Sequence, residues 1–322
     1  MILLDKDMEK RDKKSFIIPY IDQNDRFWQK LSGLYQEQIK EVYFPIIDEQ
    51  IATGRPRQPD TNLKRFLESK ILPVSVLINP VILVRPVEEI SDRIFRMLEY
   101  YLANYNLVGA TLTNLTIATK IKENFPDLNL TASTLMEIYN EQQLVMLNDV
   151  FDSIVPSTRI IRDLKALRVL RKDYTGTIRL MVNESCLSSC VFRTQHFYEM
   201  SNPEITYPNS LCNYLLEHKP WLKLTGGWIL PQHLFLFNGL YDEIKLSGRI
   251  SLQQPDRYFK VIDSYINGKA LQPHEIGGGP ASVNIPMDIE TNFYKYTLTC
   301  KKNCTTCSKC VDYWNEKIIS YE

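Results

Sequence analysis

Eight short β-rich runs alternate with amphipathic helical stretches along most of this chain of 322 residues, and this alternation restricts the fold more than any other feature. The expected strands span residues 16–21, 41–46, 74–78, 107–112, 128–132, 153–156, 177–182 and 243–246. The stretches between them repeat apolar residues at helical spacing, as Leu31, Leu34 and Tyr35 do. Strands that alternate with helices predict an α/β fold with a parallel sheet, and eight repeats predict a (β/α)₈ TIM-like barrel.

The barrel prediction also divides the chain and locates its chemistry. An open, doubly wound sheet is the alternative, but no Gly-x-Gly-x-x-Gly follows the first strand. We expect residues 1–266 to form the barrel, with an extra short strand over 228–230 and a closing helix over 256–266. Residues 267–322 form a cysteine-rich extension that we expect to pack on the barrel mouth. Barrel chemistry lies where strands end, and residues 181–186 form such a strand end.

Charge and hydropathy exclude several partners. The chain has 38 Lys and Arg against 38 Asp and Glu, so bulk charge attracts neither nucleic acid nor an anionic membrane. Its longest apolar stretch, 73–87, is interrupted by polar residues and prolines and is too short to span a bilayer. The N-terminus lacks the apolar core of a signal peptide, and we expect a cytoplasmic protein. We interpret one basic helix, over 159–171, as solvated surface; its cations are Arg159, Arg162, Lys165, Arg168, Arg171 and the adjacent Lys172.

Cysteines form two groups in this otherwise ordinary composition. The first contains Cys186, Cys190 and Cys212, and the second contains Cys300, Cys304, Cys307 and Cys310. Cytosolic thiols stay reduced, so clustered cysteines indicate metal binding or catalysis rather than disulfides. Four cysteines within eleven residues predict a metal site in the tail. Their single compact run favours iron–sulfur ligation, because structural zinc usually splits its ligands into two separated pairs; zinc remains the alternative.

The first group, Cys186, Cys190 and Cys212, follows a strand end, so we interpret it as part of the active site. Its three thiolates are enough to hold a 4Fe–4S cluster with one iron open to substrate, or a tail cysteine supplies the fourth ligand. The remaining interpretation is a packed pair, Cys186 with Cys190, since free cysteine is often buried. The spacing leaves open whether the chain holds one cluster or two metal sites.

Five further residues are candidates for catalysis. Glu184 is a candidate acid or base, or it pairs with Arg179 or Arg193. Arg193 and His196 follow the second cysteine, and His196 either transfers a proton, ligates iron or bonds loop backbone. Lys245 and Arg249 flank the last strand end, where barrels often bind anions; the alternative for Arg249 is a bridge across the barrel end.

Four segments resemble, in order, the collagenase-like peptidase family (peptidase family U, number thirty-two). They are FPDLNLTAST at 125–134, DSIVPS at 152–157, VNESC at 182–186 and YDEIKLSGR at 241–249. The resemblance covers residues 105–266 and implies a barrel with a 4Fe–4S cluster. By position, Cys186, Cys190 and Cys212 match three cluster cysteines of the family. The fourth has no counterpart between Cys212 and Cys300, so a tail cysteine replaces it or the site is open.

The resemblance also implies an activity. Despite the peptidase label, better understood members resemble oxygen-independent hydroxylases of tRNA, ribosomal RNA or a ubiquinone precursor, with prephenate as the oxygen donor. Asn183 and Glu184 replace the family's His-Gly, and Ser157 stands where the family often has Arg, so we expect a diverged substrate pocket. The leading hypothesis is an iron–sulfur oxidoreductase acting on a small molecule or peptide rather than RNA. The alternatives are a non-catalytic iron–sulfur scaffold or partner subunit, and a peptidase.

Overall fold

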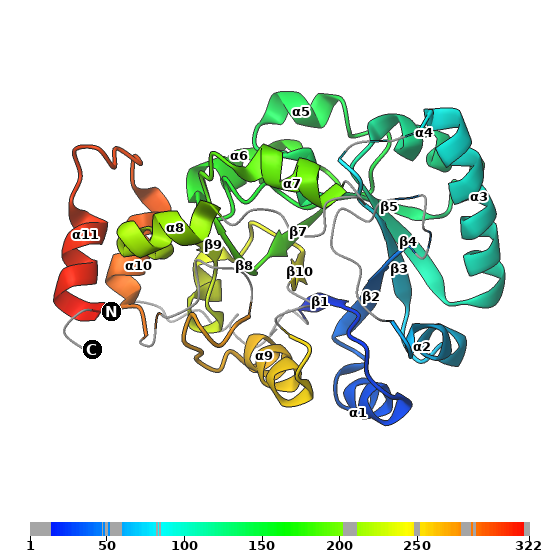
Figure 1. The fold of residues 1–322 in the computed structure, drawn as a ribbon, viewed down its shortest axis with the longest axis horizontal. Coiled ribbons are helices and arrows are strands. Elements are labelled where there is room, and N and C mark those ends of the chain that lie inside the picture. The colour runs from blue at the N-terminus through cyan, green and yellow to red at the C-terminus, as the bar shows by residue number, and fades with distance from the viewer. Residues whose placement is uncertain are drawn as a thin grey trace, which may run out of the picture.

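The computed structural model describes residues 14–46, 48, 51, 60–81, 83, 85–201, 211–247, 252–277, 285 and 288–318. Eight parallel strands close into one barrel (Figure 1). In chain order they are β1 (Ser15–Pro19), β2 (Ile39–Pro45), β3 (Val74–Ile78), β4 (Leu107–Leu112), β5 (Asn129–Ala132), β6 (Ser153–Ile154), β7 (Thr177–Met181) and β10 (Glu243–Lys245). Each strand pairs with the strand before it, and β10 closes the barrel between β7 and β1. The predicted (β/α)₈ barrel is therefore confirmed.

Helices follow the barrel strands on the outside of the sheet (Figure 1). They are α1 (Asp25–Tyr35), α2 (Leu63–Ser69), α3 (Val87–Asn104), α4 (Leu115–Asn124), α5 (Glu141–Val145), α6 (Leu164–Asp173) and α9 (Pro255–Asn267). Side-chain caps begin several of them, because the first amide groups of a helix need acceptors. The Asn24 side chain accepts from the Phe27 amide at α1, and the Asn114 side chain accepts from the Ile117 amide at α4. In the described ranges no helix is both long and apolar enough to cross a membrane.

One helix begins later than its sequence pattern predicts, and this corrects the interpretation of its basic face. The Asp163 carboxylate accepts from the Ala166 amide at 3.1 Å and caps α6, so the helix begins at Leu164 rather than at residue 159. The residues before Asp163 form turns instead. Arg162 therefore does not lie on a solvated helix face; only 7% of its surface is exposed.

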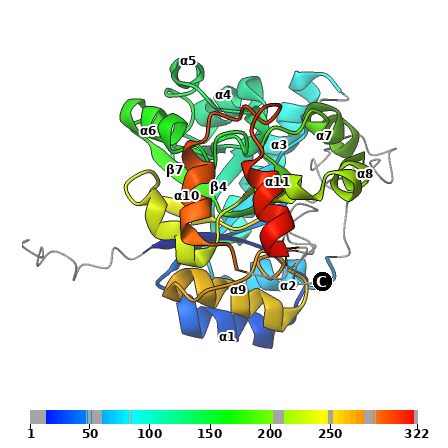
Figure 2. The same ribbon diagram turned by 90° about the vertical axis from the view of Figure 1, so that its left-hand side faces the viewer.

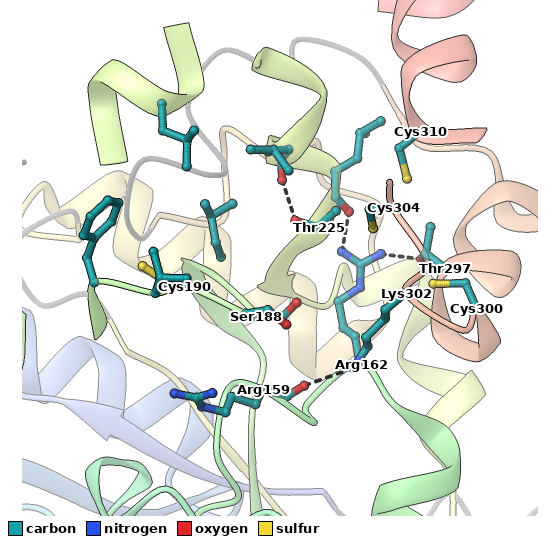
Figure 3. Close-up of a pocket in the computed structure, with 17 residues that line it drawn as sticks. Arg159, Arg162, Ser188, Cys190, Thr225, Thr297, Cys300, Lys302, Cys304 and Cys310 are labelled. Atoms are coloured by element: carbon teal, nitrogen blue, oxygen red, sulfur yellow. Dashed lines mark hydrogen bonds between the residues drawn. The ribbon is translucent and has the colours of Figure 1, made fainter. Parts of the chain in front are cut away.

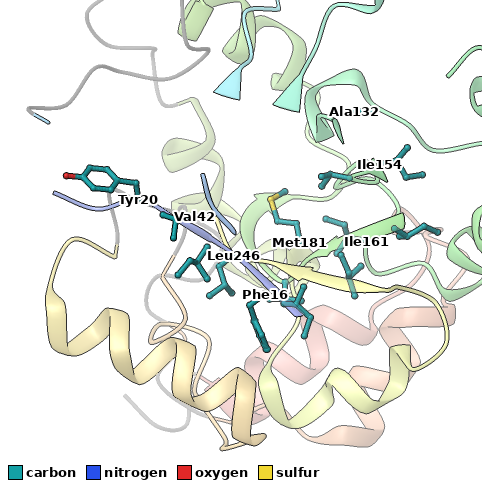
Figure 4. Close-up of a cluster of buried hydrophobic side chains, with 14 of the residues drawn as sticks. Phe16, Tyr20, Val42, Ala132, Ile154, Ile161, Met181 and Leu246 are labelled. Carbon is teal, nitrogen blue, oxygen red and sulfur yellow. The ribbon is translucent and has the colours of Figure 1, made fainter. Parts of the chain in front are cut away.

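Apolar side chains fill the space between the sheet and the helices, and Figure 4 shows part of this cluster, with Phe16, Ile154 and Leu246 among its members. The interior of the barrel is more polar. A small apolar group of Ile17, Tyr43 and Leu77 lies apart from the main cluster. Also inside the barrel, a buried ion network connects strands across the interior.

That ion network is centred on Arg179 of β7. Its guanidinium pairs with Glu41 of β2 at 2.7 Å and with Glu243 of β10 at 2.8 Å, and all three side chains are almost fully buried. Ser75 of β3 donates to Glu41 at 2.9 Å. Arg179 is thus committed to the barrel interior, and its carboxylate partners are Glu41 and Glu243 rather than the Glu184 considered from the sequence.

The chain makes a long excursion between β7 and β10. This segment contains β8 (Asn183–Leu187), α7 (Arg193–Ser201), α8 (Leu211–His218), and three elements after them: η2 (Pro220–Thr225), β9 (Gly226–Trp228) and η3 (Pro231–Phe237). Strands β8 and β9 pair antiparallel outside the barrel, and β9 overlaps the short strand expected over 228–230. Residues 181–186 are therefore not a simple strand end: β7 stops at Met181, and Cys186 lies on a second strand.

The tail lies beside this excursion. It contains α10 (Thr291–Thr299), α11 (Lys309–Tyr313) and the π-helical turn η4 (Trp314–Ile318), and Figure 2 shows α10 and α11 next to each other on one side of the molecule. Helix α10 contacts α6 and η3, and α11 contacts η2. The fully buried Tyr294 donates its hydroxyl hydrogen to the Trp228 carbonyl at 3.1 Å and stacks on His233 at 4.3 Å.

Candidate metal centre and active site

The four tail cysteines line one cavity of about 430 Å³. Cys300 caps the C-terminus of α10, and Cys310 lies in the first turn of α11. Between them, the amides of Thr306 and Cys307 both donate to the Asn303 carbonyl, at 3.1 and 3.0 Å, and this tight turn bends the run back on itself. Local backbone geometry therefore brings the compact cysteine run to a single concave surface.

A second cavity, of about 370 Å³, adjoins the first and is lined by cysteines of both groups (Figure 3). Cys300, Cys304 and Cys310 contribute from the tail, and Cys190 contributes from the segment after β8. In Figure 3 the three tail cysteines lie together on one side, and Cys190 lies on the other. Apolar side chains make most of the remaining wall: Leu187, Val191, Phe192, Leu215, Leu222 and Leu224. We name this space the shared cavity.

Arg162 is the residue of this site that sequence reasoning missed. It lines the shared cavity, donates from Nη1 to the Leu224 and Gly226 carbonyls at 2.9 and 2.8 Å, and donates from Nη2 to the Thr297 hydroxyl at 2.5 Å. Its guanidinium also lies over the rings of Trp228 and Tyr294, at 4.7 and 4.5 Å. The Asp163 cap was the sequence signal that separates Arg162 from the solvated helix.

Cys186 and Glu184 lie next to each other on β8. The Cys186 amide donates to Glu184 Oε1 at 3.1 Å. Burial raises the pKa of the Cys186 thiol, and the Glu184 carboxylate raises it further. Without a metal this cysteine is a neutral thiol at pH 7, which is the opposite of an activated nucleophile. Coordination to a metal would deprotonate it regardless.

Arg193 is buried and pairs with a carboxylate that the sequence did not single out. Its Nε donates to Glu137, which also accepts from Arg159 Nε and from the Ser157 hydroxyl, both at 2.8 Å. Glu137 follows the turn η1 (Thr134–Met136) in a left-handed conformation. Burial raises the pKa of its carboxyl, but the arginines and Ser157 outweigh burial and lower it overall. Arg193 Nη1 and Nη2 have no hydrogen-bond partner within the described ranges.

The remaining predicted residues lie elsewhere. His196 is half-buried on α7 with its ring edge-on to Phe197, and Cys212 is half-buried on α8; neither is among the residues that line the two cysteine cavities. Lys245 lines a separate, small cavity at the carboxyl end of the barrel, with its amino group 4.6 Å from the Tyr43 ring centre. The structure therefore does not bring Lys245 to the cysteines. Arg249 lies outside the described residues.

The donor set can be compared with the metals that cysteine binds. In the part of the chain that the structure describes, no three His, Cys, Asp or Glu side chains converge to hold one metal ion. The tail cysteines nevertheless supply four sulfur donors around one cavity. An iron–sulfur cluster is held by Cys thiolates, four of them for a 4Fe–4S cluster. In type and number, the tail residues fit an iron–sulfur cluster.

Comparisons with known proteins agree with the fold. No family model matches the chain. A Methanocaldococcus jannaschii protein described as an uncharacterized protease, MJ1657, is 24% identical over 228 residues, covering 65% of this chain and 66% of its own length. The chain thus spans just under two thirds of that relative. The solved structure of the U32 peptidase Mk0906 superposes with a TM-score of 0.53 at 13% identity, covering 73% of this chain and 93% of that one.

The class of protein follows from these observations: a (β/α)₈ barrel with a cysteine-rich excursion and tail. Within that class, the chain is similar in sequence to the uncharacterized protease and shares its fold with the U32 peptidase, in line with the resemblance that the sequence motifs indicate.

Proposed function

We propose that this chain is an iron–sulfur-dependent enzyme that hydroxylates or otherwise redox-modifies a small molecule or peptide without O₂. The observation that supports this proposal most directly is the shared cavity, because it is lined by Cys190 on one side and by three tail cysteines on the other. A redox group held by the tail cysteines would adjoin a space of about 370 Å³, within the range of small-molecule sites.

The side chains around this cavity define what it would hold. Mostly apolar walls exclude water and favour an apolar or aromatic body. Arg159 and Lys302 also line it, each already paired with a carboxylate, Glu137 and Asp163 respectively. When bound, an iron–sulfur cluster supplies one-electron transfer. The protein's contribution is to bind the substrate, orient it toward the cysteines and keep solvent away.

The names of the relatives favour a peptidase as the second candidate. A cysteine peptidase needs a thiolate with a low pKa beside a base. Cys186 has the opposite environment, since burial and Glu184 both raise its pKa. A chain freed of metal by chelation, assayed on unstructured peptides, separates the two candidates: cleavage at an unchanged rate would favour the peptidase.

A metal assay tests the proposal. The protein, purified without oxygen, should contain iron and acid-labile sulfide in equal amounts, at four or more irons per chain for a 4Fe–4S cluster. Cys304→Ser and Cys307→Ser should each lose most of this iron, whereas the nearby Thr305→Ser variant should retain it. Zinc alone, or no metal, would overturn the redox assignment.

Cys190→Ser tests whether the shared cavity is the place where the proposed chemistry occurs. Cys190 faces the shared cavity from the side opposite the tail (Figure 3). If the chain is an enzyme, the variant should fold and keep the iron of the tail site but lose turnover of a candidate substrate. Unchanged turnover would place the chemistry elsewhere.

A further inference from the structure

Arg162 is a buried cation that has no carboxylate partner among the described residues. Its guanidinium donates hydrogen bonds to two carbonyl oxygens and one hydroxyl, and its Nε has no partner in the described part of the chain. Arginine stays protonated in proteins, and burying an unpaired charge is costly. By contrast, the buried Arg179 has two carboxylate partners and the buried Arg193 has one. Arg162 therefore lacks the counter-charge that Arg179 and Arg193 have.

The tail cysteines that line the same cavity are the candidates for that counter-charge. Arg162 lines the shared cavity together with Cys300 and Cys310, and Figure 3 shows its guanidinium turned toward the tail. As thiols these cysteines are neutral, so they balance Arg162 only as thiolates.

We propose that Arg162 is the internal counter-charge of a thiolate-bound metal group in the tail: a positioning residue that favours metal loading and raises the group's reduction potential. This inference rests on the proposed function for the cysteines that hold the metal. Reduction adds negative charge to the group, and a cation held nearby without water favours the added charge. Its hydrogen bonds to the Leu224 and Gly226 carbonyls and its stacking on Trp228 fix the position of the guanidinium at the wall of the shared cavity.

The exposed lysines of the tail cannot perform the same role. Lys301, Lys302 and Lys309 are all exposed to solvent, where water and salt screen their charge. Lys302 is in addition shared with the Asp163 carboxylate at 3.4 Å. Because Arg162 acts from a buried position, its effect should persist at high salt, whereas the effect of the lysines should not.

Three variants of the whole chain test the inference. Arg162→Gln removes the charge but keeps a hydrogen-bond donor, Arg162→Lys keeps the charge, and Lys309→Met removes an exposed charge beside Cys310. Each is purified without oxygen, checked for folding by circular dichroism, and measured for iron per chain and midpoint potential in low and high salt. Arg162→Gln should lower the reduced-to-oxidised ratio at a fixed potential about tenfold, which is 59 mV for one electron. Arg162→Lys should recover most of this loss, and Lys309→Met should change the ratio much less.

The outcomes separate this inference from the proposed function. If the wild-type chain holds iron and Arg162→Gln retains both its iron content and its potential, only the counter-charge role is overturned. If the wild-type chain holds zinc alone, the redox function fails, and the inference is then decided by zinc affinity: a loss of tenfold or more in Arg162→Gln supports it, and no loss overturns it. A chain that binds neither metal overturns both. If Arg162→Gln does not fold, the wild-type chain is compared with Arg162→Lys. Metal content equal to that of the wild type in Arg162→Lys then supports the role, and loss of the metal contradicts it.

Discussion

Gly109 illustrates how a single missing Cβ allows two barrel strands to approach. It lies on β4 opposite Asn129 of β5, and a Cβ there would meet the Asn129 carbonyl oxygen at 2.8 Å. Gly33 is the opposite case: it lies within α1, and nothing is within 4 Å of where its Cβ would be. One glycine is required by close packing, and the other only adds freedom to the unfolded chain.

These two glycines give a matched prediction. Gly109→Ala should lower the free energy of unfolding by about 1–3 kcal/mol, because the strands must separate to admit the methyl group. Gly33→Ala should raise it by about 0.5–1 kcal/mol, because alanine is the better helix former. Urea unfolding of both variants measures the two changes. Changes of the same sign would contradict the assignment.

At the scale of elements, the docking of α10 depends on a neutral histidine. His233 of η3 is 1% exposed and stacks on Tyr294 of α10. Burial lowers its pKa from 6.5 to about 4. Between these two pH values the unfolded chain binds more protons at this position than the folded chain does. The stability that neutral His233 contributes is therefore fully present above pH 6.5 and is lost as the pH falls toward 4.

His233→Phe isolates this effect, since phenylalanine keeps the stacking and cannot be protonated. The thermal midpoint of the wild-type chain should fall more steeply than that of the variant between pH 6.5 and pH 4.5, and the two curves should run parallel above pH 7. Differential scanning fluorimetry across this range provides the comparison. Parallel curves throughout would show that His233 is not buried in its neutral form.

For the whole molecule, the ion network around Arg179 connects strands that are not neighbours. Around the barrel the order is β2, β1, β10, β7, so two strands separate β2 from β7. The contact between Arg179 of β7 and Glu41 of β2 therefore crosses the barrel interior. Removing one partner of a buried ion pair leaves the other charge uncompensated. The resulting loss of stability exceeds the net stability that the intact pair contributes.

Arg179→Met should therefore lower the free energy of unfolding by about 3–5 kcal/mol, because it leaves Glu41 buried without a cation, whereas Glu243 keeps its contact with Lys40. Arg85→Met is the control: Arg85 pairs with Glu89 on an exposed surface, and such a pair contributes about 0–1 kcal/mol. Denaturant unfolding followed by circular dichroism compares the variants. Equal decreases in the free energy of unfolding for both variants would mean that the buried network stabilises the barrel no more than an exposed ion pair does.

The strands and most helices of this fold could be predicted from local sequence. The runs at 74–78 and 107–112 match β3 and β4 residue for residue. Apolar periodicity and short-range caps act between residues close in the chain, so they are visible without any tertiary contact. The same local spacing predicted a metal site in the tail, and the four tail cysteines do line one cavity, although whether it binds a metal stays a prediction.

Burial and pairing between distant segments could not be predicted in this way. The sequence placed Arg162 among six solvated cations. Because Asp163 caps α6, Arg162 lies before the helix and donates to Thr297 of the tail, 135 residues away in sequence. Glu137 drew no attention, because its ion pair with Arg193 depends on the excursion after β7. Local patterning was sufficient for the barrel and the cysteine groups, whereas the meeting of Cys190 with the tail and the charge beside it arise from long-range packing, where the burial of each side chain depends on the elements that cover it.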